Sequence, residues 1–185
     1  MTTAFENYIE EAHRLRKKYA DKIDILVGLE TDYITEIDLD RLSQLLETYG
    51  EKIHYMVGSV HHVNEIGFDF DRATYEKAIN SFNTSPDTES LDDSSLTTFL
   101  ETYFDAQFAL LQRFHPEVIG HFDLCCLFRP GLNLPDYDAV WSKVQRNVKF
   151  AIAYGALFEL NAAAFRKGWE TAYPAEPIFK VRRHI

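Results

Sequence analysis

Four apolar segments of the sequence each end in a side chain that can bind a metal ion or a hydrogen-bonding partner: Glu30, His61, His121 and Asn161. Two imidazoles and a carboxylate suit Zn²⁺, Mn²⁺ or Fe²⁺ better than Mg²⁺ or Ca²⁺, which prefer shells made only of oxygen. Such an ion generates hydroxide from water near neutral pH and binds phosphoryl oxygens. A single histidine at a strand end is commonly a hydrogen-bonded structural residue, so a metal centre requires that Glu30, His61 and His121 meet.

The four segments are expected to be strands that alternate with helices. Apolar periodicity predicts helices over 4–19, 39–49, 96–114 and 137–154, and strands over 23–30, 54–61, 118–124 and 157–161. The first strand has the pattern of one covered on both faces. A last helical segment begins at Pro174 or Glu176 and runs to Ile185. Strands linked through helices are parallel, and the lack of a glycine-rich nucleotide motif after the first strand favours a barrel over an open sheet.

A parallel barrel would bring the candidate ligands together, because the carboxyl ends of its strands form the active-site face. Neighbouring side chains of a strand point to opposite faces, so only one of His61 and His62 can face the site, and His61 is the candidate. Asp123 is expected on the same face as His121, where it could orient a ligand or carry a proton as a catalytic residue. Its alternative role is to cap a helix or a loop.

Composition narrows the class of protein. The 185 residues, 46% of them hydrophobic, suffice for a single globular domain over 1–185, with an irregular excursion at about 64–95 that holds a short helix over 72–82. A net charge of −10 argues against nucleic-acid and membrane partners. The sequence shows neither a membrane-spanning run nor a signal peptide, and its two adjacent cysteines predict reduced thiols, so a cytoplasmic protein is expected.

Four motifs resemble the histidinol phosphatase branch of the polymerase and histidinol phosphatase (PHP) superfamily, and its fungal monofunctional members most of all. They are LVGLE (26–30), VGSVHHVNEIGFDFD (57–71), VIGHFDL (118–124) and ELNAAAFRKG (159–168). The resemblance implies an α/β fold, a distorted (β/α)7 TIM-like barrel. It also implies up to three divalent metal ions (zinc, manganese or iron) and hydrolysis of L-histidinol phosphate, a small-molecule phosphate ester, to L-histidinol and phosphate.

The resemblance also implies roles for individual residues. Glu30, His61 and His121 match metal ligands of the family, and Arg166 matches a basic residue that holds the substrate phosphate. Arg129 is a weaker candidate for the same task. A guanidinium group can hold a phosphate monoester through two parallel hydrogen bonds. Either arginine could instead cap a helix or pair with a carboxylate.

The sequence departs from the family pattern, because it contains no H-x-H, T-E-H or D-x-H motif. His184 does not replace the last of these, since Arg182 stands two residues before it. We therefore expect a partial barrel that lacks the first two strand units and the last one, with exposed sheet edges that favour self-association. Two alternatives to histidinol phosphate hydrolysis stay open: a non-catalytic barrel fragment, and a phosphoesterase that acts on another small phosphate ester.

Overall fold

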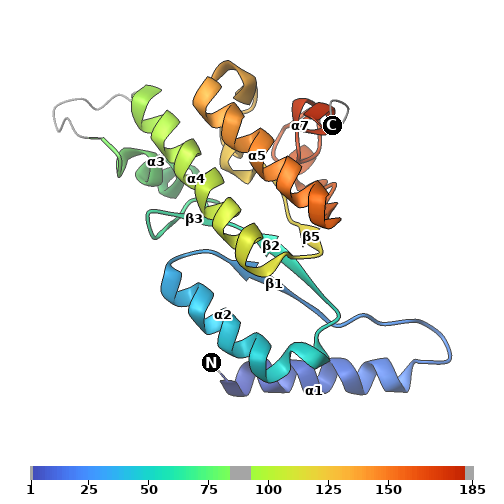
Figure 1. Ribbon diagram of the computed structural model, residues 1–185. Coiled ribbons are helices and arrows are strands. Elements are labelled where there is room, and N and C mark those ends of the chain that lie inside the picture. Colours follow the sequence, from blue (N-terminus) through green and yellow to red (C-terminus); the bar gives the residue numbers. More distant parts are fainter. Residues whose placement is uncertain (1, 84–92, 182–185) are drawn as a thin grey trace.

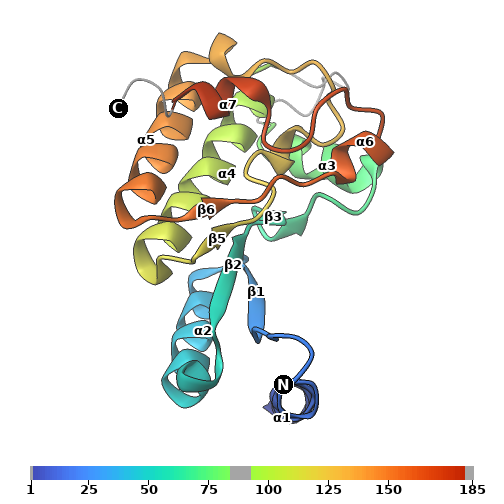
Figure 2. The ribbon, with the colours of Figure 1, turned by 90° about the vertical axis from the view of Figure 1, so that its right-hand side faces the viewer.

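A computed structural model gives the fold and describes residues 2–83 and 93–181. Figure 1 shows the arrangement of the elements. Within the described residues, four parallel strands form one sheet in the order β1-β2-β5-β6 (Figure 2). The strands are β1 (Gly28–Asp32), β2 (Tyr55–Ser59), β5 (Val118–Ile119) and β6 (Leu157–Phe158). The helices α2 (Glu36–Tyr49), α4 (Asp93–Phe114) and α5 (Asp138–Tyr154) connect successive strands of the sheet. The predicted α/β class with parallel strands is therefore confirmed.

Other elements lie around this framework. They are α1 (Thr2–Lys18), β3 (His62–Val63), β4 (Ile66–Gly67), α3 (Arg72–Asn80), α6 (Ala163–Arg166), α7 (Glu176–Val181) and three 3₁₀ helices at Gly50–Lys52, Leu124–Cys126 and Leu134–Asp136. Within the described residues, no helix combines the length and the apolar character needed to cross a bilayer.

The helices cover the sheet, with α2 beside β2 and with α4 and α5 beside β5 and β6 (Figure 2). Helices α4 and α5 pack against each other through a buried amide: the side chain of Asn147 donates hydrogen bonds to the Phe104 carbonyl (2.7 Å) and to Gln107 (3.0 Å). An aromatic cluster fills the core between these helices and the strands, and it contains Phe68, Tyr75, Phe99, Tyr103, Phe104 and Phe122. This core fixes the segments that follow β2 and β5.

The prediction for the first strand is wrong about where the strand starts and about how far it is buried. The strand begins at Gly28, opposite Tyr55 of β2, and extends beyond Glu30 to Asp32. Ile23 and Leu26 are 59% and 64% exposed, so the run before Gly28 is not covered on both faces. Its apolar residues resemble a buried strand in sequence, but the parallel ladder with β2 starts only where β2 itself starts.

The other strands are shorter than predicted. The strand predicted over 54–61 is observed at Tyr55–Ser59. The strand predicted over 118–124 is observed only at Val118–Ile119, and a 3₁₀ helix begins at Leu124. Chain 157–161 contributes Leu157–Phe158, and Asn161 instead pairs with Tyr173 in an isolated antiparallel bridge. These three strands still end one or two residues before His61, His121 and Glu159.

Part of the predicted irregular stretch is regular structure. Strands β3 and β4 form a hairpin whose turn residues, Asn64 and Glu65, both have positive φ (51° and 62°), which is the conformation of a tight two-residue hairpin turn. Helix α3 confirms the short helix predicted over 72–82, and the side chain of Asp71 caps it by accepting a hydrogen bond from the Thr74 amide. Residues 84–92 of this stretch lie outside the described residues.

The C-terminal part follows its prediction in part. Helix α5 ends at Tyr154, and Gly155 adopts the left-handed conformation (φ 90°) that glycine tolerates. Residues 163–166, where no helix is predicted, form the short helix α6. Helix α7 begins at Glu176, one of the two predicted starts, whereas 182–185, including His184, lie outside the described residues.

Candidate metal centre

Glu30, His61 and His121 meet at the carboxyl ends of β1, β2 and β5. Nε2 of His61 lies 3.1 Å from Nε2 of His121. Oε1 of Glu30 lies 3.7 Å from Nε2 of His61 and 3.4 Å from Nε2 of His121. The sequence positions are far apart, but three neighbouring parallel strands bring the side chains to the same edge of the sheet.

The three atoms are arranged as metal ligands would be. A tetrahedral ion with bonds of about 2.0–2.1 Å holds its ligand atoms about 3.3 Å apart, and the observed separations of 3.1, 3.4 and 3.7 Å are close to this value. Two imidazole nitrogens and one carboxylate oxygen also match the ligands that zinc, manganese and iron accept. The geometry therefore fits a divalent ion held by Glu30, His61 and His121.

Polar neighbours hold Glu30 and His61 in place. The hydroxyl of Ser59, the last residue of β2, donates a hydrogen bond to Oε1 of Glu30 (2.7 Å). Oδ1 of Asp32 accepts a hydrogen bond from the backbone amide of His61 (2.9 Å), and Oδ2 of Asp32 lies 2.7 Å from Nδ1 of His62. The same carboxylate therefore fixes the chain at His61 and binds the imidazole of His62.

A second carboxylate does the same for His121. Oε2 of Glu159 accepts a hydrogen bond from the backbone amide of His121 (2.9 Å), while Oε1 accepts one from the side chain of Asn161 (3.0 Å). Glu159 follows β6, the neighbour of β5. In both cases a carboxylate at one strand end holds the amide of a candidate ligand at the adjacent strand end.

Burial and charge give the two imidazoles different acid strengths. Burial disfavours the charged form of His61, but the adjacent Asp32 carboxylate outweighs burial and raises the pKa of His61. Burial and the neighbouring His61 lower the pKa of His121. Burial also works against the charge of Asp32, but the hydrogen bonds and charges of His61 and His62 prevail and lower the pKa of Asp32. His121 is therefore held in the neutral form that a metal ligand requires.

The comparison with protein families agrees with this site. The family described as the PHP domain matches residues 2–163 of the chain. The chain belongs to the PHP domain family. The match includes Glu30, His61 and His121, so the candidate metal centre lies inside the PHP domain.

Three curated proteins are similar to this PHP domain. A probable histidinol-phosphatase of Schizosaccharomyces pombe is 42% identical over 96% of the chain and 55% of its own length. A histidinol-phosphatase of Saccharomyces cerevisiae is 29% identical over the whole chain and 60% of its own length. A histidinol-phosphatase of Bacillus subtilis is 26% identical over 65% of the chain and 44% of its own length. The chain thus spans little more than half the length of the two fungal relatives.

Asp123 lies in a different environment from the three candidate ligands. It is 1% exposed, and its Oδ2 accepts a hydrogen bond from the backbone amide of Ala175 (2.8 Å). Burial outweighs the backbone hydrogen bonds and raises the pKa of Asp123 to about 6. Its side chain lines a pocket that none of Glu30, His61 and His121 lines. The catalytic role predicted for Asp123 stays a prediction.

The two predicted phosphate-binding arginines belong to different segments of the chain. Arg166 ends α6, is exposed, and makes no hydrogen bond or ion pair with the residues that the structure describes. Arg129 is half-buried and lines a pocket with Arg72, Tyr75 and Phe128. Their roles in phosphate binding stay predictions.

Asp32 and Glu159 are the site residues that the sequence analysis missed. Both are carboxylates at strand ends, two residues after Glu30 and two residues before Asn161. Their position close to the candidates Glu30 and Asn161 was the feature of the sequence that could have identified them. Their partners, however, are backbone amides on neighbouring strands, which spacing along the chain does not reveal.

Replacing Asp32 with asparagine is expected to weaken binding of a divalent ion by about 10–100-fold, as changes to groups that orient metal ligands do. The asparagine oxygen still accepts the His61 amide, but the negative charge beside the imidazoles of His61 and His62 is lost. Isothermal titration with Zn²⁺ measures the change. Asp24→Asn is the matched control, because Asp24 is exposed and outside the site. Equal affinities of the two variants would rule out a positioning role for Asp32.

Proposed function

We propose that the protein is a metal-dependent phosphomonoester hydrolase that converts L-histidinol phosphate to L-histidinol and phosphate. The observation that carries this proposal is the cluster of Glu30, His61 and His121, whose ligand atoms lie 3.1–3.7 Å apart at adjacent strand ends of a PHP domain. The names of the three curated relatives support the choice of substrate.

The fold is part of the same proposal. The four parallel strands with their connecting helices are consistent with a segment of a TIM-like barrel, and we propose that 1–185 form one PHP-type domain with the strand arrangement of a distorted (β/α)7 barrel. In such a barrel the carboxyl ends of the strands face the substrate. The candidate metal centre stands at this end of β1, β2 and β5.

The residues of the site would have two roles, metal binding and positioning of the metal ligands. Glu30, His61 and His121 would hold a zinc, manganese or iron ion. When bound, a divalent ion of this kind polarises phosphoryl oxygens and lowers the pKa of water. Asp32 and Glu159 keep the chain at His61 and His121 in position through their backbone amides. These contacts preorganise the ligands, which matters because misplacement by about 1 Å can cost about 100-fold in rate.

Phosphate release from L-histidinol phosphate, measured with the purified chain supplied with Zn²⁺, Mn²⁺ or Fe²⁺, tests the function. A panel of other small phosphate monoesters at the same concentration provides the comparison. Selective hydrolysis of L-histidinol phosphate supports the proposal. Preference for another ester would leave a metal phosphoesterase with a different substrate, and metal binding without hydrolysis of any ester would support a non-catalytic barrel fragment.

Arg166 is proposed to bind the substrate phosphate. Replacing it with alanine is expected to weaken inhibition by inorganic phosphate by about tenfold, because a charge-assisted hydrogen bond is worth about 1.5–3 kcal/mol. The exposed position of Arg166 predicts little change in the melting temperature. Lys167→Ala removes the adjacent exposed cation and serves as the control. An inhibition constant for phosphate that is the same in Arg166→Ala and wild type would reject this role.

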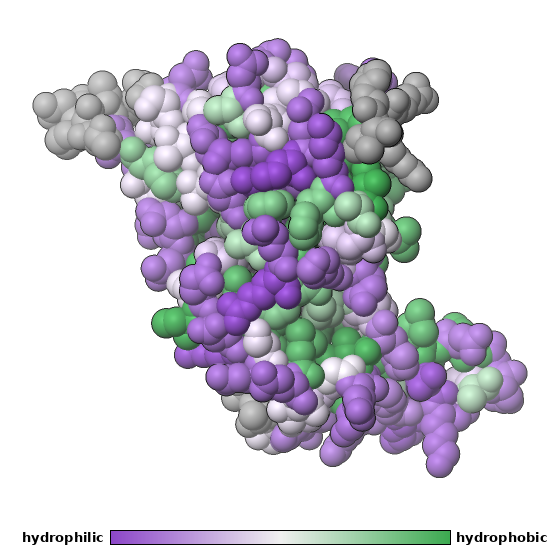
Figure 3. Space-filling model, viewed as in Figure 1, coloured by the Kyte–Doolittle hydropathy of each residue, from purple (hydrophilic) through white to green (hydrophobic). Residues whose placement is uncertain are grey.

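The edges of the sheet support the proposed self-association. Within the described residues, β1 and β6 are the two edge strands of the parallel sheet. Beside β1 lies an apolar groove of about 770 Å³ between α1, β1 and α2, lined by Phe5, Leu29, Leu42, Leu45 and Tyr49 among others. Figure 3 shows apolar surface in this region of the molecule. An open edge next to an apolar groove favours pairing with a second copy of the chain.

Light scattering after gel filtration, over a range of protein concentrations, measures this association. Replacing Leu45 with glutamate places a charge in the groove and is expected to shift the protein towards the monomer. Leu157→Glu on β6 tests the opposite edge with the same change of side chain. A wild-type protein that stays monomeric at every concentration would contradict the proposal.

A further inference from the structure

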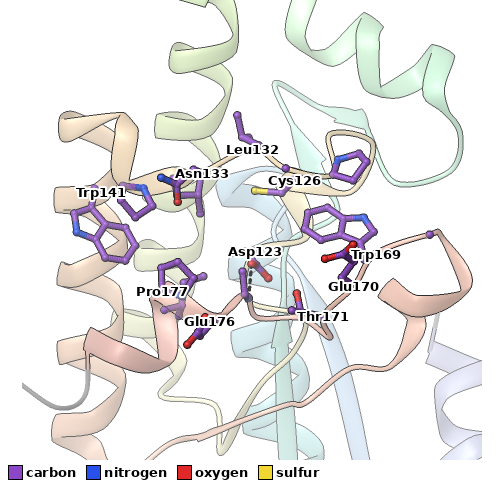
Figure 4. A pocket seen from close by; sticks show the side chains of 17 residues that line it. Asp123, Cys126, Leu132, Asn133, Trp141, Trp169, Glu170, Thr171, Glu176 and Pro177 are labelled. Carbon is purple, nitrogen blue, oxygen red and sulfur yellow. Dashed lines mark hydrogen bonds between the residues drawn. The ribbon is translucent and has the colours of Figure 1, made fainter.

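A pocket of about 510 Å³ has Asp123 in its lining (Figure 4). Its walls come from the loop over 130–135, the start of α5, the loop over 168–171 and the start of α7. None of Glu30, His61 and His121 lines it. Any ligand of this pocket would therefore be recognised by a separate set of side chains.

A buried carboxylate, that of Asp123, stands in the lining of this pocket. Figure 4 shows Asp123 between Pro177 and Trp169, beneath Cys126. One of its oxygens, Oδ2, accepts the Ala175 amide, whereas Oδ1 is buried and has no hydrogen-bond partner among the described residues. A buried carboxylate oxygen without a donor is costly, so a ligand that offers an N–H group gains a strong hydrogen bond here.

The charge of the lining selects the kind of ligand. Among the residues that the structure describes, the lining contains three acidic residues, Asp123, Glu170 and Glu176, and no lysine, arginine or histidine. Glu176 forms an ion pair (2.9 Å) with Lys180, which does not line the pocket. An anion would be repelled by this lining and would find no cationic partner in it. A cation gains from Asp123 and Glu170, and gains most from the buried Asp123, because the attraction between charges is stronger where water is excluded.

Two tryptophans belong to the apolar part of the pocket lining. Trp141 and Trp169 both line it, and the indole N–H of Trp169 is fixed by a hydrogen bond to the Leu127 carbonyl (3.2 Å). The ring of Trp169 also packs edge-on against Tyr173, with ring centroids 5.4 Å apart. Fixed indole faces attract cations and aromatic groups alike.

We propose that this pocket binds a small organic cation, in which an ammonium or imidazolium N–H group donates to Oδ1 of Asp123 and an aromatic or apolar body lies against Trp141 and Trp169. The site goes beyond the proposed phosphatase activity, because neither phosphate nor a metal ion takes part in it. Whether an organic cation binds in this pocket therefore does not depend on whether the candidate metal centre binds a metal ion.

Tryptophan fluorescence tests the proposal directly, because the two tryptophans of the chain are the two that line the pocket. Benzylamine is the cationic probe, and benzyl alcohol is the neutral probe of the same shape. Titrations are performed at about pH 8 with a chelator present, so that amine binding to a metal ion does not contribute. The expected result is a saturable change with benzylamine at concentrations at least about tenfold lower than with benzyl alcohol. Equal binding of the two probes, or no saturable change with benzylamine, would overturn the proposal.

Two variants locate the binding to this pocket. Asp123→Asn keeps an oxygen for the Ala175 amide but removes the charge, and it is expected to weaken benzylamine binding about tenfold or more. Thr171→Arg places a cation at the exposed rim of the pocket and is expected to weaken benzylamine binding as well. Thr98→Arg adds the same charge on α4, away from the pocket, and should bind like wild type.

Circular dichroism shows which variants are folded. If Asp123→Asn does not fold, Thr171→Arg against Thr98→Arg decides the question. Benzylamine binding that is unchanged in folded Asp123→Asn, or equal in the two arginine variants, would refute this location.

Discussion

Alanine in place of His61 or His121 is expected to remove the bound divalent metal ion and the phosphatase activity with it. Each imidazole supplies one of the three atoms that lie 3.1–3.7 Å apart. Changes to groups that merely orient a ligand cost about 10–100-fold in metal affinity, so loss of a ligand is expected to cost more than about 100-fold. The side chains of His61 and His121 are 23% and 12% exposed at strand ends outside the aromatic core, so the fold should survive.

Metal content by mass spectrometry, phosphate release from L-histidinol phosphate and circular dichroism together test this expectation. His13→Ala is the matched control, because His13 lies on α1 and its imidazole contacts the Lys52 carbonyl instead of the cluster. The variants at 61 and 121 should retain the wild-type spectrum and lose metal, while the control retains both. Wild-type metal content in both variants would show that these imidazoles do not bind the ion.

The meeting of Glu30, His61 and His121 could be predicted without knowing where each strand begins and ends. In a parallel sheet every strand runs in the same direction, so residues that follow the strands gather at one edge. The prediction therefore survived large errors in strand length. His121 is a case in point: its strand was predicted over seven residues, but β5 contains only Val118 and Ile119.

The residues around the ligands could not be predicted in the same way. Asp32 reaches the His61 amide because β1 and β2 pair with Asp32 opposite Ser59, and Glu159 reaches the His121 amide because β6 lies beside β5. The order and register of strands decide these contacts. Both are properties of the assembled sheet, and a single sequence gives the periodicity of each strand without its neighbours.

The burial of the first strand and the hairpin turn could not be predicted for similar reasons. Ile23 and Leu26 have the composition of a buried strand, but no ladder partner stands beside them, and they are exposed. The hairpin of β3 and β4 turns at Asn64 and Glu65, whereas the strong sequence signal for such a turn is asparagine followed by glycine. Because glutamate stands at the second turn position, the sequence of this polar stretch does not indicate a hairpin.

Phe122 connects the candidate metal centre to the core, and its replacement with alanine is expected to lower the free energy of unfolding by about 3–5 kcal/mol. The side chain is fully buried, and its ring lies 5.7 Å from that of Phe104 and 5.4 Å from that of Phe158. Alanine leaves a cavity between α4 and β6 that the surrounding helices can fill only in part. Such a loss is a large fraction of the 5–15 kcal/mol that typically stabilises a domain.

Urea unfolding followed by circular dichroism measures the loss, and Phe70→Ala makes the same change of side chain at a position that is 87% exposed. Phe70→Ala should differ from wild type by no more than about 0.5 kcal/mol. The Phe122 carbonyl still accepts hydrogen bonds from Tyr103 (3.1 Å) and Gln107 (3.0 Å) of α4, so the backbone beside His121 stays anchored in the variant. Metal affinity should consequently fall far less in Phe122→Ala than in His121→Ala. If Phe122→Ala were as stable as Phe70→Ala, the core would not depend on Phe122. If the Phe122 and His121 variants lost metal equally, packing, and not hydrogen bonding to α4, would position His121.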